Sequence, residues 1–543
     1  MPKHWIVCLA ILLPAAASAQ IPTGGSSGGA TRPATLPPSG RTSPTGSVTI
    51  QQSTSPAGVD TLNTSVQVNG NLAGSIPGAK PPAGPISLTL GDAIKMGLQA
   101  NLGVIAAGNA SATARAERIE ALSALLPNIS AGASDTVAQT NLAAYGFVFH
   151  IPPGFDFSIP TIVGPYNYSQ AQASVNASIY DPVARRNWKT ARELEQASAL
   201  SAKDARELVV MAVAGTYLET TATAARIASQ QAQVANAQAV YDQARIRKEA
   251  GTNARIDVMR TLVELQTQKQ RLNSLAADLR KQKLALARTI GLPLDRDFTV
   301  ADPLSPNTIP VPEPSSAIQQ AFTQRSDLKA AEAQVRAARQ AVNAARGERL
   351  PSVVFSGYYG VLGPNPAETH GVFSATGSVN LPLWTGGRIQ ADVAQAEAAL
   401  HQREAELADQ RGRVEQEVRA ALIELETANG QLQLAATNRD YAAETLREAR
   451  DRFNLGVTTT VEVVQAQEQV ASAEADYVSS LFALDLARLN LSRAAGQAET
   501  SLPDLLKAQG ARCSAPQDIE ELRRSTAARG APFCANSLEG TRP

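Results

Sequence analysis

Side chains that could carry catalytic chemistry are few in this 543-residue chain and lie far apart. The four histidines are His4, His150, His370 and His401, a spacing that favours neither a metal site nor a Ser-His-Asp arrangement. The patterns H-E-x-x-H, C-x-x-C, G-x-x-x-x-G-K and strand-borne G-x-G-x-x-G do not occur. We therefore expect no enzymatic activity, no metal and no cofactor. The formal net charge of zero gives no reason to expect a nucleic-acid partner.

The cysteines are best understood together with the start of the chain. Residues 1–19 combine a lysine, a short apolar run and the A-x-A pattern Ala17-Ser18-Ala19, which is typical of a cleaved export signal. Cleavage would remove Cys8 and leave Cys513 and Cys534 in an oxidising compartment. A disulfide between them would close a loop of roughly 20 residues and contribute ~3 kcal/mol. Two unrelated thiols are the alternative.

Two carboxylates, Asp257 and Glu462, occupy equivalent positions in a long internal duplication. Gly251 recurs as Gly456 about 205 residues later, a period too long for a short solenoid repeat. Each carboxylate follows its glycine closely and opens a helical pattern. Both residues can therefore be explained without a functional role. Glu462 can be part of the capping box that begins at Thr459, and Asp257 can be a carboxylate that the helix dipole stabilises.

Long helices position these carboxylates. Residues 185–250 and 388–455 contain scarcely a Gly or Pro, and about 65 helical residues span on the order of 100 Å. Apolar residues recur along them at heptad spacing, which is typical of helices packed side by side along their length. After each glycine the chain returns through 256–290 or 461–495. Each half of the duplication is therefore expected to form a long antiparallel helical hairpin.

A two-residue rhythm precedes each helical hairpin. Apolar and uncharged polar residues alternate along 170–180 and again along 373–381, as in strands with one apolar and one polar face. A barrel wall between lipid and water fits this pattern, and a soluble antiparallel sheet is the alternative. Four strands cannot close a useful barrel, whereas three copies of the chain would supply twelve. No segment after the export signal shows an unbroken apolar run that would predict an ordinary transmembrane helix.

These patterns predict the following organisation. After the signal peptide 1–19, a Pro/Gly/Ser/Thr-rich segment at 20–85 is expected to be disordered. Thr89 is expected to cap a helix that runs to Pro127. The first structural repeat covers 86–295, with a strand hairpin at about 128–180 and a helical hairpin at about 183–291. A Pro-rich linker at 296–314 follows. The second repeat covers 315–498, with a strand hairpin at about 352–381 and a helical hairpin at about 388–496, and a C-terminal tail covers 499–543.

Several short segments resemble the TolC-like outer-membrane efflux proteins, the outer membrane factors of tripartite export systems. They are the opening segment 87–94, the Leu-Pro turns at 126–127 and 350–351, the segment 381–388 that enters the second long helix, and the tip segments 453–457 and 461–463. The resemblance covers about residues 86–498. It implies a mainly α fold with a transmembrane β part, in which three chains form a 12-stranded β-barrel in the outer membrane and an α-helical tunnel in the periplasm.

The resemblance also implies partners and function. A periplasmic adaptor and an inner-membrane transporter would meet the lower end of a passive, homotrimeric exit duct for small molecules or drugs, with outer-membrane lipid around its barrel. The exit duct of a type I protein secretion system is the alternative within the same family. A periplasmic coiled-coil adaptor or structural protein is the alternative from another class, although an adaptor should have one helical hairpin flanked by β-rich domains.

The family's gate lies at the periplasmic tip of the helical hairpins and maps onto named positions here. The acidic gate position matches Glu462, and the next acidic position of the family is Gln465 in this chain. Thr458 replaces a linking basic residue of some relatives, and Asp257 matches a first-repeat linking position. The expected tip turns and adaptor-docking residues are Gly251, Thr252, Gly456 and Val457.

Overall fold

The computed structural model describes residues 31–36, 46–53, 63–77, 86–146, 161–251, 254–304, 306, 310–455 and 457–500. The signal peptide, Thr252, Gly456, Cys513 and Cys534 lie outside these residues. The chain divides into two compact units. Unit 1 comprises 1–42, 108–202 and 327–410, and unit 2 comprises 43–107, 203–326 and 411–543.

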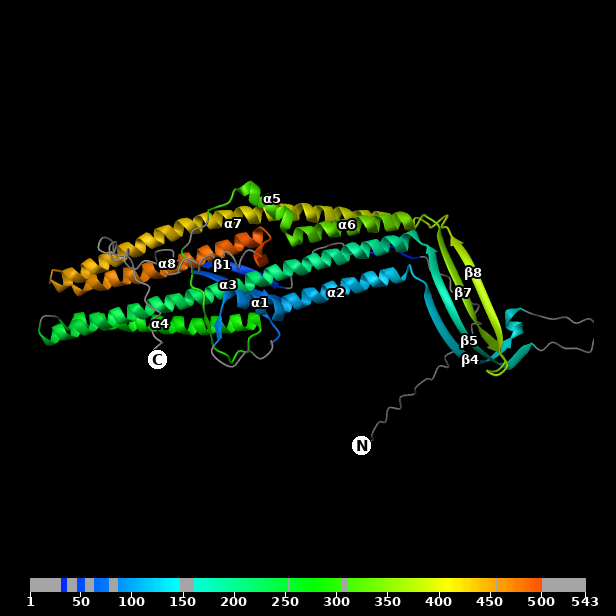
Figure 1. Ribbon diagram of the computed structural model, residues 1–543, viewed down its shortest axis with the longest axis horizontal. Coiled ribbons are helices and arrows are strands. Elements are labelled where there is room, and N and C mark those ends of the chain that lie inside the picture. The colour runs from blue at the N-terminus through cyan, green and yellow to red at the C-terminus, as the bar shows by residue number, and fades with distance from the viewer. Residues whose placement is uncertain are drawn as a thin grey trace, which may run out of the picture. The chain divides into compact units, whose positions relative to one another are not determined.

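Unit 1 contains the strand hairpins and the helical segments that enter and leave them (Figure 1). Its elements are, in chain order, part of α2 (Leu102–Ser123), β4 (Asn128–Asn141), the short helix η2 (Leu142–Tyr145), β5 (Ile162–Tyr180), part of α3 (Pro182–Glu249), α6 (Ser326–Gly347), β7 (Ser352–Gly363), β8 (His370–Asn380) and part of α7 (Arg388–Asn454). The strands occupy the two ranges in which strand hairpins are expected from the sequence.

The four strands form one antiparallel sheet in the order β4-β5-β7-β8. The central pairing of β5 with β7 joins the two halves of the duplication in a single sheet. Within the described residues, the outer edges of β4 and β8 have no further strand beside them.

Unit 2 holds the tips of both helical hairpins and a small mixed region beside them. Here α3 is followed by α4 (Arg255–Ile290), and α7 by α8 (Thr460–Ala494). The remaining elements are β1 (Gly46–Ser53), β2 (Asn63–Gly70), η1 (Asn71–Ala73), β3 (Ile86–Leu88), α1 (Leu90–Ala100), β6 (Phe298–Val300) and α5 (Pro314–Gln324). A shared core of α1, α3, α4 and α8 residues includes Tyr217 and Phe482, both almost fully buried.

The disorder expected for 20–85 is wrong for part of that segment. Strands β1 and β2 pair in an eight-residue antiparallel hairpin, and Val66 and Leu72 are buried in the core of unit 2. A Cβ atom at Gly215 of α3 would lie 2.9 Å from Val66, so only glycine permits this close approach. A few well-placed apolar residues thus order a segment whose composition is otherwise that of a disordered chain.

Two further expectations need correction. The linker expected at 296–314 contains β6, which pairs in parallel with β3. The helix expected from Thr89 to Pro127 is capped by the Thr89 side chain as predicted, but it breaks at Asn101. The buried Asn101 side-chain amide donates to the carbonyl oxygens of Leu72 and Thr289, which explains the break.

Helices α3 and α4 end at glycines. Gly251 has a φ of +75° after α3, and Gly291 caps α4 with a φ of +80°. Helix α3 also includes an 18-residue stretch that is long and apolar enough to cross a membrane. Because 72% of that stretch is buried inside the protein, helix packing accounts for its apolar character. The stretch is interrupted by polar residues, so it is not the unbroken apolar run whose absence the sequence indicates.

Candidate channel wall and gate

The sheet of unit 1 has one face that is mainly polar and almost free of charge. The strand register places on this face Ser130, Ser134, Gln170, Gln172, Ser174, Asn176, Ser178, Ser352, Ser356, Tyr358, Ser374, Thr376 and Ser378. Across the four strands, Asp135 and His370 are the ionisable residues other than tyrosine, and of these only His370 lies on the polar face. Such a face can line a water-filled path, but it offers no ring of charge to select ions.

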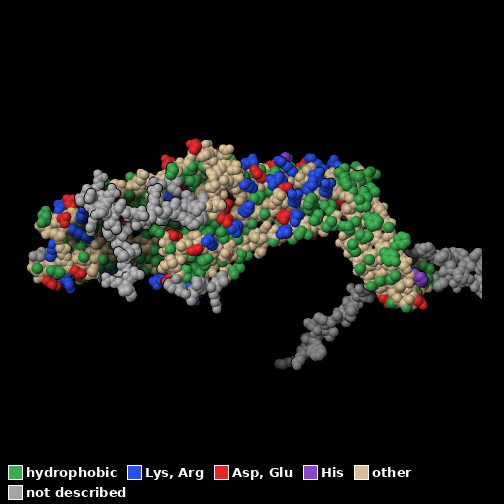
Figure 2. Space-filling model, viewed as in Figure 1, with side chains coloured by type: hydrophobic (Ala, Val, Ile, Leu, Met, Phe, Trp, Pro, Cys, Tyr) green, Lys and Arg blue, Asp and Glu red, His purple; other side chains and the backbone are tan. Residues whose placement is uncertain are grey.

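The opposite face is mainly apolar and exposed, with Asp135, which accepts a hydrogen bond from the Ser169 hydroxyl, as its charged exception. It carries Ile129, Ala131, Ala133, Val137, Ala171, Ala173, Val175, Ala177, Val353, Phe355, Tyr359, Val361, Phe373, Ala375 and Val379. Phe373, Ile129 and Val379 are 77%, 75% and 70% exposed, and the space-filling view shows apolar side chains over the strands (Figure 2). A large apolar surface of this kind needs lipid or another protein to cover it.

The tip of the second helical hairpin is braced by Glu462. This residue lies in the first turn of α8, and its carboxylate accepts a hydrogen bond from the Thr458 hydroxyl. The Arg452 guanidinium, in the last turn of α7, lies 3.2 Å from the other carboxylate oxygen. Thr459 occupies the helix-capping position, yet its side chain makes no capping bond. The contacts of Glu462 therefore run across the tip loop, in place of the capping box that the sequence suggested.

A second link joins the two helical hairpins. The Arg247 guanidinium, near the end of α3, lies 4.2 Å from the centroid of the Phe453 ring in α7. It also donates to the Phe453 carbonyl oxygen at 3.3 Å and to the Asn454 side-chain oxygen at 3.4 Å. The Gln243 amide donates to the same Asn454 oxygen at 3.0 Å. This link holds one tip against the other within unit 2.

Phe453 connects this link to a small core at the tips. It is 6% exposed and packs in a cluster with Val240 of α3 and Val463 of α8. Arg247 thus lies over a buried ring, where its charge is partly shielded from water. Separation of the tips would expose that ring as well as break the polar contacts.

The other predicted gate residues are placed differently. Asp257 lies in the first turn of α4, where its carboxylate is 3.9 Å from Arg260 of the same helix, a long pair consistent with the helix-dipole interpretation. Gln465 is exposed, and so is Val457 at the tip loop. The structure therefore brings Thr458 and Glu462 together but leaves Asp257 apart from them among the described contacts.

A buried polar layer lies further along the hairpins, away from the tips. The Gln268 amide donates to Glu264 at 2.5 Å, and Gln230 of α3 donates to the Gln268 side-chain oxygen at 2.6 Å. Burial raises the pKa of Glu264; the Gln268 hydrogen bond opposes this rise, and the negative charge of Glu468 adds to it. Arg271 pairs with Glu468 at 3.6 Å. This layer joins α3, α4 and α8.

The sequence did not identify Arg247, Phe453, Asn454 or Gln243 as linking residues. A signal was present, because the repeat counterparts of Phe453 and Asn454 are Lys248 and Glu249. Positions where duplicated halves diverge at a tip are candidates for contacts that only one half makes. Which residue such a position contacts depends on the tertiary structure, and the repeat alone does not reveal it.

Comparison with known proteins decides the family. Residues 94–292 and 317–497 match the outer membrane efflux protein family, OEP. The chain belongs to the outer membrane efflux protein family. This membership confirms the predicted resemblance, the outer-membrane location and the class of efflux channel.

Two curated members of the outer membrane efflux protein family illustrate the likeness. The outer membrane efflux protein BepC of Brucella suis biovar 1 is 27% identical over 258 residues, which are 44% of this chain and 54% of BepC. The toluene efflux pump outer membrane protein TtgC of Pseudomonas putida is 26% identical over 352 residues, 60% of this chain and 69% of TtgC. The match thus spans about half the length of BepC.

A solved structure supports the fold. The Campylobacter jejuni CmeC outer membrane channel superposes with a TM-score of 0.65 at 15% identity, covering 84% of this chain and 98% of CmeC. The predicted fold class, mainly helical with a β part, is confirmed.

Proposed function

We propose that this chain is the passive, homotrimeric exit duct of a tripartite efflux system for small molecules. The observation that carries the proposal is the sheet of unit 1, which has an exposed, mainly apolar face, an almost uncharged polar face and, within the part of the chain that the structure describes, two open edges. One face is suited to lipid and the other to water, and the open edges require partners with the same geometry.

Three copies of the chain would provide partners for all of these edges. The edge of β8 in one copy would pair with the edge of β4 in the next, and twelve strands would close a barrel with a water-filled interior. The nearly uncharged polar face gives such an interior little preference for cations or anions. We therefore assign solute selection to the pump partners and the tips, and not to the barrel wall.

The tips supply the gate in this proposal. The Arg452–Glu462 brace fixes the second tip loop, and the Arg247–Phe453 link ties the hairpins of one protomer together. Gln465 stands where the family has a further acid, so the mouth would carry one ring of three carboxylates. Because Arg452 compensates each Glu462, strong capture of cations at the mouth is not expected.

The family supports a proposal for the partners and the class of substrate. A periplasmic adaptor would dock at the tip turns around Gly251 and Val457 and join the duct to an inner-membrane transporter. The relative TtgC is described as part of a toluene efflux pump, which favours small apolar solutes. Co-purification of the tagged full chain with an adaptor and a proton-driven pump would support efflux. An ATP-driven exporter with a large secreted substrate would instead indicate type I secretion.

The duct itself is tested with purified full-length protein. We expect light scattering in detergent to give the mass of three chains, and planar lipid bilayers to show discrete conductance steps. A monodisperse monomer without conductance would overturn the proposal.

The gate is tested by substitution at the tips. Glu462→Ala removes the acceptor for both Thr458 and Arg452, so we expect a higher single-channel conductance. Asp257→Ala should have a smaller effect because its nearest cation lies on its own helix. Gln465→Ala is the matched control from the same exposed turn. Unchanged conductance of folded Glu462→Ala trimers would count against the gate.

A further inference from the structure

Both strand-to-helix junctions of the duplication present an exposed aromatic side chain. Tyr180 ends β5 just before α3 begins, and Trp384 lies between β8 and α7. Trp384 and its neighbour Leu383 are each 89% exposed, and Tyr180 is 48% exposed. Exposure of a tryptophan to this degree needs an explanation, because water is a poor environment for its apolar ring.

A bulge turns Tyr180 toward the apolar face of the sheet. Without an irregularity, Tyr180 would share the polar face with Ser178. The register shifts between these two residues, so that Tyr180 lies opposite Val353, whereas Ser178 lies opposite Val354. Val353 belongs to the apolar face, and Tyr180 therefore joins it. The aromatic side chains at the two junctions therefore extend the apolar surface to the edge of the sheet where the long helices begin.

Cations lie at the same border. A Cβ atom at Gly347, the end of α6, would be 3.8 Å from Pro182 at the start of α3. Arg388, the first residue of α7, pairs with Glu348 at 2.6 Å. These two contacts bring both strand-to-helix junctions and the helix-to-strand junction between α6 and β7 to one level of unit 1.

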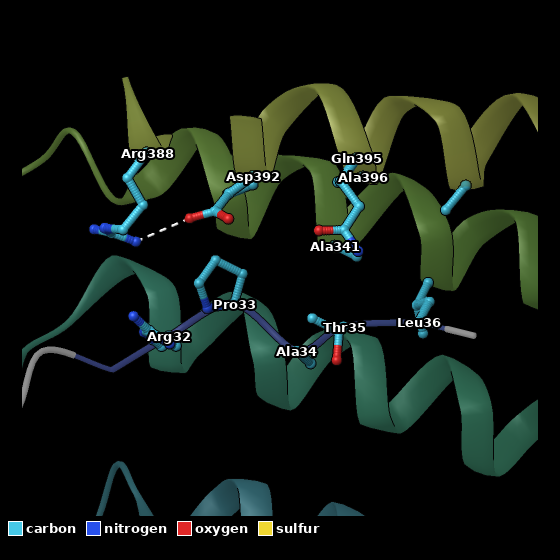
Figure 3. A pocket seen from close by; sticks show the side chains of 12 residues that line it. Arg32, Pro33, Ala34, Thr35, Leu36, Ala341, Arg388, Asp392, Gln395 and Ala396 are labelled. Carbon is cyan, nitrogen blue, oxygen red and sulfur yellow. Dashed lines mark hydrogen bonds and ion pairs between the residues drawn. The ribbon is translucent and has the colours of Figure 1, made fainter. Parts of the chain in front are cut away.

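Two arginines at this level have no side-chain partner among the described residues. Arg185 in the first turn of α3 and Arg349 just before β7 are exposed, and neither guanidinium has a hydrogen bond or ion pair in the described part of the chain. Nearby, Arg32 and Arg388 lie at the same end of a pocket (Figure 3). Figure 2 shows Lys and Arg side chains gathered over the helices of unit 1 where the apolar strand surface ends.

We propose that this junction collar, made of Tyr180, Trp384, Arg185 and Arg349, binds the headgroups of anionic phospholipids. Tyrosine and tryptophan favour the boundary between lipid chains and water, where the ring is buried and the polar tip stays hydrated. A guanidinium beyond that boundary can bind a lipid phosphate through paired hydrogen bonds. The proposal rests on the proposed function, since it requires the apolar sheet face to lie in the membrane.

The charge pattern favours an anionic lipid as the occupant of the collar. A neighbouring copy of the chain could cover the aromatic residues, but it would have to leave both arginines in contact with water or provide acids for them. The collar is continuous with the apolar face that lipid should cover. Its cations carry the sign that attracts phosphatidylglycerol over phosphatidylcholine.

The lipid preference is measured on the full-length protein by native mass spectrometry in detergent with equal amounts of DOPG and DOPC. We expect wild type to retain mainly DOPG. Arg185→Gln/Arg349→Gln should reduce the DOPG preference about 25-fold, since each cation near an anionic surface contributes roughly a factor of five. The matched control is Arg288→Gln/Arg296→Gln, two exposed arginines of unit 2. Equal lipid ratios in wild type and the collar variant would overturn the proposal.

A second measurement reports on Trp384 itself. Trp188→Phe leaves Trp384 as the chain's tryptophan outside residues 1–19. In vesicles of DOPC and DOPG at 3:1, brominated lipid should quench its fluorescence. Absence of quenching would show that another copy covers the collar and would overturn the lipid assignment. Conductance recorded on the same preparations separates the two proposals, because a pore that conducts without lipid preference refutes the collar alone.

Discussion

Substitution of Arg247 tests whether the inter-hairpin link keeps the channel closed. Arg247→Gln removes the contact with the Phe453 ring and the charged donor to its carbonyl oxygen. A partly exposed cation–π contact contributes about 0.5–1 kcal/mol, and the donor adds a similar amount once solvent competition is considered. We take about 1 kcal/mol per protomer as the net loss.

The effect should be amplified by the assembly. If three protomers open together, the loss is about 3 kcal/mol, and the closed-to-open ratio falls by roughly 150-fold. A channel that is open about 1% of the time would then be open about 60% of the time. Single-channel recording in planar bilayers measures this open fraction directly.

A neighbouring arginine provides the control. Arg245 is exposed, lies one half-turn before Arg247 on α3, and has no hydrogen bond or ion pair among the described residues. Arg245→Gln changes the charge of the tip equally but should leave the open fraction unchanged. If both variants behave like wild type in folded trimers, or if both open equally, the link does not hold the channel closed.

Three further outcomes follow from the structure. Burial raises the pKa of Glu264, so this side chain holds its proton more tightly in the folded protein than in the unfolded chain. The contribution of Glu264 to the free energy of unfolding should therefore be fully present below its pKa in the unfolded chain and be lost as the pH rises through its pKa in the folded protein. The melting temperature of Glu264→Gln should therefore fall less than that of wild type between pH 5 and pH 8. Ala375→Arg, on the apolar face, should cost about 2–4 kcal/mol and block membrane assembly, whereas Ser374→Arg, on the polar face, should assemble and lower the conductance to cations. Gly291→Ala would place a Cβ atom 2.6 Å from a neighbouring side chain at a φ of +80° and should destabilise the protein by about 3 kcal/mol or more. Gly251→Ala, at a φ of +75° but with open space around the Cβ atom, should cost about 1 kcal/mol. Thermal unfolding measures both losses.

The sequence predicted those elements that have a clear period. Alternation along 170–180 and 373–381 is visible because strand side chains point to opposite faces at every second residue. The long helices and their glycine ends are equally local features, and the duplication doubles each signal. The helices and strands could therefore be predicted from their periods, whereas the family and the outer-membrane location came from the resemblance of short segments and from the export signal.

Other features depend on contacts that no local pattern records. The β1–β2 hairpin is ordered because Val66 fits against Gly215, which lies far away in sequence. The link from Arg247 to Phe453 requires two hairpins to lie side by side. The bulge before Tyr180 reverses the face that strict alternation assigns to it. In each case the deciding neighbour is distant in the chain, so composition and periodicity could not identify it.

The edges of β4 and β8, beside which no further strand lies among the described residues, would affect how the proposed trimer assembles. In hydrocarbon, each peptide group that lacks a partner costs several kcal/mol, so a solitary copy cannot reside in the bilayer. For the proposed trimer, insertion and association would then coincide, and the rate of maturation should rise with a power of the subunit concentration greater than one. Slow synthesis would leave single copies waiting in the periplasm, where holding chaperones and proteases compete for them.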